Sequence, residues 1–329
     1  MALQRITIVL LCLLVVGCGT KDEAFVFRWA GAQPVQHPRS QSMLYFKREI
    51  ESRTNGRIRV ENYFSGVLGR EREVMDMVAT GVLQGTRGGL YADATPNYRI
   101  YELPFLFANW DELLRFSSSD VAQQINAAAR PNGFHVPACG ISQGFRVHTN
   151  NVRPIHTPKD LQGLKMRVPS QEVLLVTSQA LGANPQEISF AEVYQAARTG
   201  VIDGQDNAAS NIWDYNIHEV QKYLTVTKFC TGADPFIVSL DWYQRLPPDL
   251  QAVFDEVARE TISYSDQLNR DSEEKYIQLL SQELETNYLT GDEFARFRKL
   301  ADPVYQHFVD KGDLTWEEIE EARRIAKGN

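Results

Sequence analysis

The sequence predicts an α/β fold built from two similar α/β domains with a cleft between them. The first observation is an alternation of strand-like and helix-like segments over residues 25–88, which is typical of a parallel sheet with helices packed on it. The second is the return of this alternation over residues 157–205. The third is a pair of hexapeptides, TGVLQG at 80–85 and TGVIDG at 199–204, which lie 119 residues apart and differ at two of six positions.

The first half contains three predicted strands and two predicted helices. Apolar residues alternate with polar ones in the strands, and in the second helix they stand at 74, 75, 77 and 78. Asn55-Gly56 and Gly81 are typical residues at which a helix ends. The expected elements are strands over 25–30, 57–64 and 82–88 and helices over 38–54 and 71–80.

The second half repeats this order and adds one short helix. Thr157 can cap a one-turn helix, Pro158 suits its first position, and Gly163 ends it. Ser189 and Glu192 have the spacing of a capping box, which predicts a helix from there to Thr199. The expected elements are a one-turn helix over 157–163, strands over 164–168 and 201–205, an extended segment over 183–189, and helices over 172–182 and 189–199.

The C-terminal third is predicted to be helical. Apolar spacing from Pro248 to about Asn287 indicates one long helix or two, and a helix of ~35 residues would be ~50 Å long, enough to brace both domains. Two more helices are expected after it. The last one opens with a second capping box, formed by Thr315 and Glu318.

The composition is that of a globular protein and argues against nucleic acid as a partner. Of the 329 residues 43% are apolar and 23% are charged, and the formal net charge is −8. Nucleic acids and anionic membrane surfaces require concentrated Lys and Arg, whereas a small anionic ligand requires only one local positive site. His148 and His156 lie eight residues apart with no cysteine pair, so no metal and no cofactor are expected.

The first residues are predicted to be a targeting segment. An apolar run of 11 residues, ITIVLLCLLVV, follows Arg5 and is too short to span a bilayer of ~30 Å. Val15-Val16-Gly17-Cys18 resembles a bacterial lipobox, which predicts a signal peptide over 1–17 and lipidation of Cys18. A signal peptide cut elsewhere is the alternative. The mature protein is expected to be exported and tethered by lipid, with residues 19–24 as a polar leash.

Two cysteines remain once the signal peptide and the lipidation site are set aside. Cys139 and Cys230 stand in strand-like segments far apart in the sequence. We expect them to be small core residues, although one disulfide is possible in an oxidising compartment.

One sequence motif suggests an enzyme. GISQG, at 140–144, matches the G-x-S-x-G nucleophile elbow and would make Ser142 a hydrolase nucleophile. That motif requires a strand, a tight turn and then a helix, but FRVHT at 145–149 alternates like a strand. The chain is therefore expected not to be an enzyme, with a serine hydrolase kept as an alternative.

Two arginines stand on strand faces opposite apolar neighbours. They are Arg167 in LKMRVPS and, 21 residues earlier, Arg146 in GFRVHT. Both can converge on one carboxylate, because a planar guanidinium offers two parallel charge-assisted hydrogen bonds. Structural ion pairs with Asp or Glu account for the same positions equally well.

Several longer stretches carry a family resemblance: TPKDLQGLKMRVPS, LGANPQEISFAEVYQAARTGVIDGQDN, HEVQKYLTVTKF, GRIRVENYFSGVLGREREV and ELPFLF. Together they resemble the substrate-binding proteins of tripartite ATP-independent periplasmic (TRAP) transporters, the DctP family, over nearly all of the mature chain. The resemblance implies a periplasmic-binding-protein-like fold, in which crossing strands and a long helix join two domains that close on a ligand. The implied domains are 24–143 plus 233–272, and 144–232 plus 273–329.

The same resemblance implies a binding site for a carboxylate. The family's strand arginine in the K-h-R-V-P motif, which forms a salt bridge with the ligand, falls on Arg167, and a second arginine matches Arg146. The asparagine after D-G-Q-x falls on Asn207, although Asp206 and Ala208 depart from the family's Glu and Pro.

Five further positions are weaker candidates. They are Glu71 for ligand hydroxyls, Ser170 and Phe190 as pocket lining, Arg87 as a second cation facing the cleft, and Trp213 as an aromatic wall. An exposed helix charge at Glu71, packing at a helix start for Phe190 and core packing for Trp213 are the structural alternatives.

The implied function is capture of a small organic acid by a lipid-anchored solute-binding protein. The ligand would be a sugar acid, a uronate or a C4-dicarboxylate, and the partners would be the membrane subunits of a TRAP transporter. The location would be the periplasm or the outer face of the cytoplasmic membrane. Presentation of the ligand to a membrane receptor, as a sensor, is the alternative to transport.

Overall fold

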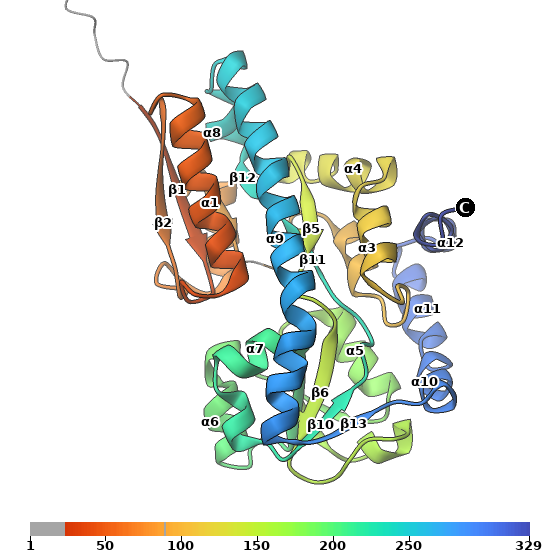
Figure 1. The fold of residues 1–329 in the computed structure, drawn as a ribbon. Helices are drawn as coiled ribbons and strands as arrows, with labels where there is room; N and C mark the ends of the chain where they lie inside the picture. Colours follow the sequence, from red (N-terminus) through yellow and green to blue (C-terminus); the bar gives the residue numbers. More distant parts are fainter. Residues whose placement is uncertain (1–23, 89) are drawn as a thin grey trace, which may run out of the picture.

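The computed structural model describes residues 24–88 and 90–329 and places them in two lobes, each built on one β-sheet (Figure 1). The strand orders are β2-β1-β3-β12-β4 and β13-β10-β6-β9-β7-β8. The predicted signal peptide, 1–17, and Cys18 lie outside the described residues. The strands are β1 Phe25–Gly31, β2 Ile58–Tyr63, β3 Gly85–Arg87, β4 Phe134–His135, β6 Arg146–Asn150, β7 Lys165–Val168, β8 Asn184–Glu187, β9 Gly204–Ala208, β10 Tyr223–Val226, β12 Ile237–Ser239 and β13 Glu285–Tyr288.

Helices pack on both faces of the sheets, as the alternation predicts. In the first lobe α1 and α9 cover an aromatic core that contains Phe27, Trp29 and Phe254, while α2 packs with Ala30 on the other side. In the second lobe α6, α7 and the end of α9 share one core, and α5 packs with Met166 in another. The helices are α1 Pro38–Arg53, α2 Glu71–Ala79, α3 Trp110–Ser117, α4 Asp120–Ala127, α5 Glu172–Ala180, α6 Val193–Arg198, α7 Ala209–Asp214, α8 Leu240–Gln244, α9 Pro248–Glu283, α10 Gly291–Arg298, α11 Asp302–Asp310 and α12 Trp316–Ala326.

Two chain segments cross between the lobes side by side. β5 (Cys139–Ile141) leads from β4 to β6, and β11 (Ala233–Pro235) leads back from β10 to β12; the two strands pair antiparallel. The 36-residue helix α9 runs along this connection and packs against α1 in the first lobe and α7 in the second (Figure 1). The predicted α/β class, with two similar lobes, crossing strands and a long helix, is therefore confirmed.

Two carboxylates of α9 hold the crossing segment in place. Asp266 Oδ1 accepts a hydrogen bond from the Ile141 amide at 2.8 Å, and Glu273 Oε2 accepts one from the Phe145 amide at 2.8 Å. Side chains at Gly140 and Gly144 would collide with these carboxylates, because an added Cβ would lie 2.6 Å from Asp266 Oδ1 and 2.5 Å from Glu273 Oε2. The glycines of GISQG therefore let the long helix approach the crossing strand closely.

The hexapeptide repeat performs the same two tasks in each lobe. Its first glycine, Gly81 or Gly200, follows the end of α2 or α6 in the left-handed region, with φ of 76° and 75°. Its second glycine is Gly85 or Gly204, which begins β3 or β9. β3 pairs with the antiparallel strand β12, and β9 pairs with the antiparallel strand β6. The repeat thus marks a helix end followed by a strand on which another strand packs closely.

Some elements differ from those predicted. The strands expected over 82–88 and 201–205 begin only at Gly85 and Gly204. The helix expected from Ser189 begins as a 3-10 turn and becomes α6 at Val193, because Ser189 Oγ donates to the Glu192 carboxylate instead of capping a backbone amide.

The C-terminal tail differs as well. It contains three helices instead of two, and Thr315 and Glu318 form the expected capping box of the last one. α11 packs on α5 and α12 packs on α3, so the tail contacts both lobes. The domain boundaries inferred from the sequence remain a prediction.

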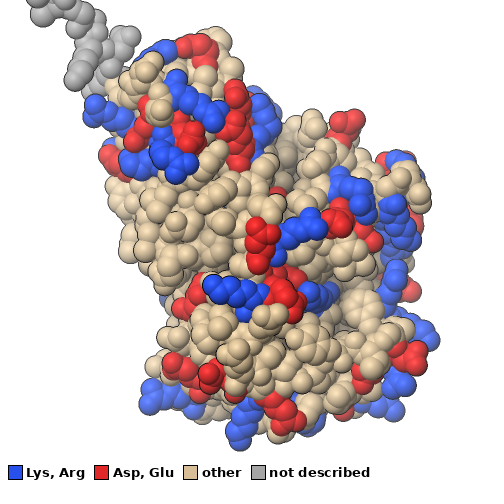
Figure 2. All heavy atoms as spheres, viewed as in Figure 1, with Lys and Arg blue, Asp and Glu red and all other residues tan. Residues whose placement is uncertain are grey.

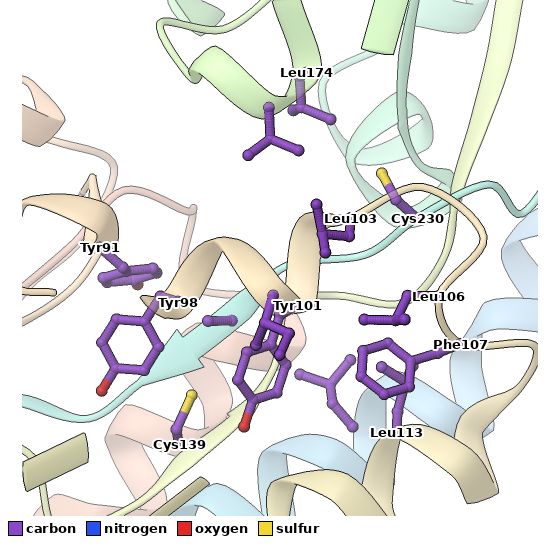
Figure 3. Packing of buried hydrophobic residues seen from close by; sticks show 14 of the residues in the cluster. Tyr91, Tyr98, Tyr101, Leu103, Leu106, Phe107, Leu113, Cys139, Leu174 and Cys230 are labelled. Atoms are coloured by element: carbon purple, nitrogen blue, oxygen red, sulfur yellow. The ribbon is translucent and has the colours of Figure 1, made fainter. Parts of the chain in front are cut away.

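The two cysteines outside the N-terminal segment are buried and free. Figure 3 shows Cys139 beside Tyr98 and Tyr101, and Cys230 in another part of the same hydrophobic cluster, near Leu103. The core role expected for both is confirmed. None of the described helices is long and apolar enough to cross a membrane.

The close packing at the second glycine of the repeat predicts a large effect on stability. An added Cβ on Gly204 would overlap the carbonyl oxygen of Thr149, and backbone cannot move aside as a flexible side chain can. Gly204→Ala should lower the free energy of unfolding by about 1–3 kcal/mol, as overpacking typically does. Chemical denaturation measures this change.

Gly291→Ala is the matched control. Gly291 is the first residue of α10, and no atom lies within 4 Å of an added Cβ. The control should leave stability almost unchanged, and equal stability of both variants would contradict the packing argument.

Candidate functional site

A cavity of about 300 Å³ lies between the lobes, at the lower end of the ~300–1,000 Å³ range of small-molecule pockets. A larger hollow, of about 860 Å³, runs along α3, α4 and α9 and contains none of the predicted ligand-binding residues. The interlobe cavity is lined by residues from both lobes and from the crossing segments, among them Gln33, Arg39, Glu71, Tyr91, Glu102, Ser142, Gln143, Arg146, Arg167, Ser170, Phe190, Asn207 and Asn211.

Arg167 is a buried cation without a counterion among the described residues. It lies on β7, is 3% exposed, and donates from Nε to the Ile188 carbonyl at 2.8 Å. Its guanidinium carbon lies 5.6 Å from the centre of the Phe190 ring. Burial, and next the nearby Arg146, lower the pKa of Arg167 to about 10. Because a buried charge is costly without a partner, this position is suited to an anion.

Arg146, by contrast, has a structural partner. Its Nε donates to the Asp206 carboxylate at 2.5 Å and its Nη2 to the Asp206 carbonyl at 2.6 Å. The structure thus places Arg146 both in an ion pair and on the cavity wall. Asp206, which replaces the family's usual Glu, is the residue that neutralises it.

Asn207 belongs to a chain of side-chain amides. Its Oδ1 accepts hydrogen bonds from the Ala208 amide at 3.0 Å and from Asn211 Nδ2 at 2.7 Å. Asn211 Nδ2 also donates to Gln143 Oε1 at 2.7 Å. Both oxygen contacts of Asn207 are therefore internal, and no hydrogen bond among the described residues engages its Nδ2. Gln143 and Asn211 were not predicted as site residues. The one sequence signal was the motif G-x-S-x-G, which contains Gln143; in the structure this residue adopts a left-handed φ of 58°.

The first lobe contributes a second buried arginine that the sequence did not suggest. Arg39 donates from Nε to Asp234 at 3.2 Å and from Nη2 to Ser142 Oγ at 2.9 Å. Tyr91 OH also donates to Asp234, at 3.3 Å. Burial acts against ionisation of Asp234, but Arg39 and Arg87 hold the pKa of this carboxyl below its usual value.

The expectation that Arg87 faces the cleft is wrong. Its side chain is fully buried and pairs with Asp234 of β11, and it also donates to Ser42 Oγ at 3.1 Å and Ser265 Oγ at 3.2 Å. It is not among the residues that line the cavity. The crossing strand β11 supplies the carboxylate that takes up this charge.

The ion pairs of the two lobes occupy equivalent positions with the charges exchanged. Arg87 follows the second glycine of the first hexapeptide by two residues, and Asp206 follows that of the second by two. Their partners, Asp234 and Arg146, each lie four residues before the residue that pairs with that glycine. Arg87 thus pairs with the crossing strand β11, which leads into β12, and Asp206 pairs with Arg146 at the start of β6, so the two ion pairs have opposite polarity.

The weaker candidates divide into two groups. Glu71 and Phe190 line the cavity, and Phe190 packs edge-on against Tyr215 with ring centres 4.6 Å apart. Ser170 also lines the cavity, but its hydroxyl donates to Glu187 at 2.6 Å. Trp213 does not line the cavity; its ring stacks on another side chain and joins the core of the second lobe, which is the structural alternative for this residue.

Ser142 does not have the surroundings of a nucleophile elbow. It follows β5, and β6 comes next where the motif requires a helix. None of the six histidines, all of which the structure describes, is hydrogen-bonded to it. Among residues 24–88 and 90–329, no group of His, Cys, Asp and Glu is arranged to hold a metal.

Glu102 is a further cavity residue that the sequence reasoning did not single out. It is the last residue of the 3-10 helix η2 (Pro96–Glu102) and begins the motif ELPFLF. Burial raises the pKa of its carboxyl to about 7, against the opposing effect of Arg146 and Arg99.

Comparisons with known proteins show which family the chain belongs to. Residues 30–311 match the family model of "Bacterial extracellular solute-binding protein, family 7", DctP. The C4-dicarboxylate-binding periplasmic protein DctP of Rhodobacter capsulatus is 28% identical over 295 residues, which are 88% of each chain. The protein of the same name from Vibrio cholerae is 29% identical over 279 residues, or 83% of this chain and 82% of the other.

Solved structures show the same fold. The sugar acid binding protein DctPAm from Advenella mimigardefordensis, in complex with galactonate, has a TM-score of 0.86 at 23% identity and covers 93% of this chain and 99% of its own. A TRAP periplasmic solute-binding protein from Shewanella oneidensis with bound succinate has a TM-score of 0.85 at 24% identity, covering 92% and 100%. The chain therefore belongs to the DctP family of bacterial extracellular solute-binding proteins, the TRAP transporter family that its motifs resemble.

Proposed function

We propose that this protein captures a small organic acid in the interlobe cavity and delivers it to the membrane subunits of a TRAP transporter. The observation that carries the proposal is the buried guanidinium of Arg167, for which the described residues supply no carboxylate. A ligand carboxylate would neutralise it out of contact with bulk water, where an ion pair is worth more than the ~0–1 kcal/mol of an exposed pair.

The surrounding groups fit a carboxylate held at one end of the ligand. The terminal nitrogens of Arg167 offer the parallel donors that a carboxylate accepts, and Asn207 Nδ2 adds a neutral donor. Arg146 contributes positive potential, although Asp206 shares its charge. The relatives named above bind C4-dicarboxylate, galactonate and succinate by their names or structures, which supports an organic acid as the ligand here.

The place of action follows in part from the family. Membership of an extracellular solute-binding family indicates that the protein works outside the cytoplasm. Our proposal adds a lipid anchor on Cys18, supported by the lipobox-like stretch 15–18. Figure 2 shows basic and acidic side chains interspersed over the face viewed, with charged groups also at the waist between the lobes.

Replacing Arg167 should abolish high-affinity binding. Arg167→Ala leaves the ligand carboxylate desolvated and unpaired, which costs about 3–5 kcal/mol, or about a hundredfold to several thousandfold in Kd. Arg167→Lys should also bind poorly, because an ammonium group cannot reproduce the guanidinium fork. Calorimetry with organic acids selected by a thermal-shift screen measures both effects.

Arg59→Lys is the control for this experiment. Arg59 also stands on a strand, β2, but it is exposed and distant from the cavity lining. The control should bind like the wild type. Unchanged affinity in Arg167→Ala would show that the proposed anion site is wrong.

Ser142 should not react as a catalytic serine. Its hydroxyl accepts a hydrogen bond from Arg39, and a guanidinium cannot serve as a general base because it carries no free lone pair at neutral pH. A fluorophosphonate probe should therefore leave the protein unlabelled, as judged by mass spectrometry. Stoichiometric labelling that is lost in Ser142→Ala would instead support the hydrolase alternative.

Cys18→Ser should release the protein from the membrane. Without the thiol, no lipid can be attached, so the variant should move to the soluble periplasmic or culture fraction and take up no labelled fatty acid. Cys139→Ser is the control, because Cys139 is buried in the fold. A variant at Cys18 that remains in the membrane fraction would contradict lipid anchoring.

A further inference from the structure

We propose that Glu102 is the specificity-determining residue of the cavity and that it selects hydroxylated monocarboxylic acids over dicarboxylic acids. This inference rests on the proposed function, in which Arg167 binds the ligand's carboxylate. Glu102 would accept a hydrogen bond from a hydroxyl group at the other end of the same ligand.

The backbone of Glu102 is held firmly by its neighbours. Tyr101 and Leu103 are each 1% exposed and pack in the hydrophobic cluster, where Figure 3 shows Leu103 near Cys230. Glu102 itself is only partly buried and lines the cavity. Two anchored neighbours therefore fix the backbone from which this side chain reaches the cavity.

The carboxylate lies against the crossing segment and has no internal partner. Glu102 Oε1 would be 3.9 Å from an added Cβ on Gly232, and Ser142 Cβ would be 3.4 Å from the same point. Among the described residues, no hydrogen bond and no ion pair within 4 Å engages this carboxylate; Arg146 of β6 and Arg99 of η2 act on it only at longer range. It is thus an acceptor with free capacity at the cavity wall.

Glu102 and Arg167 reach the cavity wall from different elements. Glu102 ends the 3-10 helix η2, and Arg167 lies on strand β7 of the second lobe. The two side chains therefore belong to different parts of the wall. A ligand that bridges them presents a carboxylate to one and a different functional group to the other.

The ion pairs of the lining favour one ligand carboxylate and not two. Arg146 pairs with Asp206, and Arg39 shares Asp234 with Arg87, so Arg167 is the one buried lining cation with no carboxylate partner among the described residues. A second ligand carboxylate near Glu102 would meet another carboxylate and no unpaired cation. A hydroxyl group meets an acceptor there, and hydrogen bonds to charged groups are the stronger kind.

The affinities for the two ligand classes should depend on pH in opposite directions, because each class requires a different protonation state of Glu102. The pKa of Glu102 is about 7. A ligand hydroxyl is bound best by the ionised carboxylate, so affinity for a hydroxylated monocarboxylate should fall, by about tenfold, as the pH drops from about 8.5 to 5.5. A second ligand carboxylate requires a protonated Glu102, so affinity for a dicarboxylate should rise over the same range.

The experiment compares Glu102→Gln with the wild type on matched ligands. The probes are aldonates of three to six carbons, such as galactonate, and the aldarates of the same chain length, such as galactarate, together with succinate. Calorimetry across this pH range should show that the wild type prefers aldonates. The variant should bind aldonates about tenfold to a hundredfold more weakly, bind dicarboxylates no worse, and lose the pH dependence.

A ligand-free measurement provides a second readout. Because the folded pKa lies above the ordinary value of 4.5, the folded protein holds a proton that the unfolded chain releases, and stability falls as the pH rises between about 4.5 and 7. Glu102→Gln lacks this loss, so its Tm should increase relative to the wild type over that window. Glu274→Gln, which removes an exposed charge from α9, should show no such trend.

The possible outcomes distinguish a failure of the role proposed for Glu102 from a failure of the proposed function. If acids bind and depend on Arg167, but Glu102→Gln leaves the preference and the pH dependence unchanged, the role of Glu102 is wrong and the proposed function stands. A wild-type preference for dicarboxylates also overturns the role of Glu102. If no acid of either class binds, the proposed function fails and this inference fails with it.

Discussion

The buried, unneutralised charge of Arg167 is the constraint on which the site depends. A guanidinium removed from water is costly, and the protein compensates only in part, through the Ile188 carbonyl and the face of the Phe190 ring. The neighbouring arginines do not share this condition, because Arg146 pairs with Asp206, and Arg39 and Arg87 share Asp234. Among the described residues, the cavity lining thus has one buried arginine that no carboxylate contacts.

The two lobes reach this arrangement with one structural plan. In each, a parallel β-α-β unit receives an antiparallel strand from a crossing segment, and a glycine allows that strand to pack closely. An ion pair with few exposed atoms secures the crossing strand β11 in the first lobe and the incoming strand β6 in the second. The polarity of the pair is reversed between lobes, so the arginine points from the third strand in one and from the incoming strand in the other. Only the second arrangement leaves the arginine, Arg146, at the cavity wall.

Much of this plan could be predicted from local sequence patterns. Periodicity located the helices and strands of residues 25–88 and 157–205 and the long C-terminal helix, and the hexapeptide repeat indicated the two related halves, because helix ends and close strand contacts both favour glycine. The period of two also placed Arg167 away from the apolar face. The family resemblance then suggested that Arg167 binds a ligand carboxylate.

The remaining site residues depend on distant contacts that a local pattern does not contain. Arg87, like Arg167, stands on a predicted strand, yet β11 brings Asp234 to it from 147 residues away. Arg39 lies in the first predicted helix, and its pairing likewise depends on this distant carboxylate. No sequence pattern singles out Glu102, because its role depends on the absence of a hydrogen-bond or ion-pair partner for its carboxylate among the described residues.

The long helix α9 has a mechanical consequence. It is one continuous hydrogen-bonded rod that packs on α1, grips the crossing strand through Asp266 and Glu273, and packs on α7. A rotation of one lobe against the other must therefore bend this rod or slide one lobe along it, and helices bend only gently without a kink-forming residue. The helix therefore limits the rotation of one lobe against the other. The limit comes from its stiffness and from the two carboxylates that hold its middle against the crossing strand.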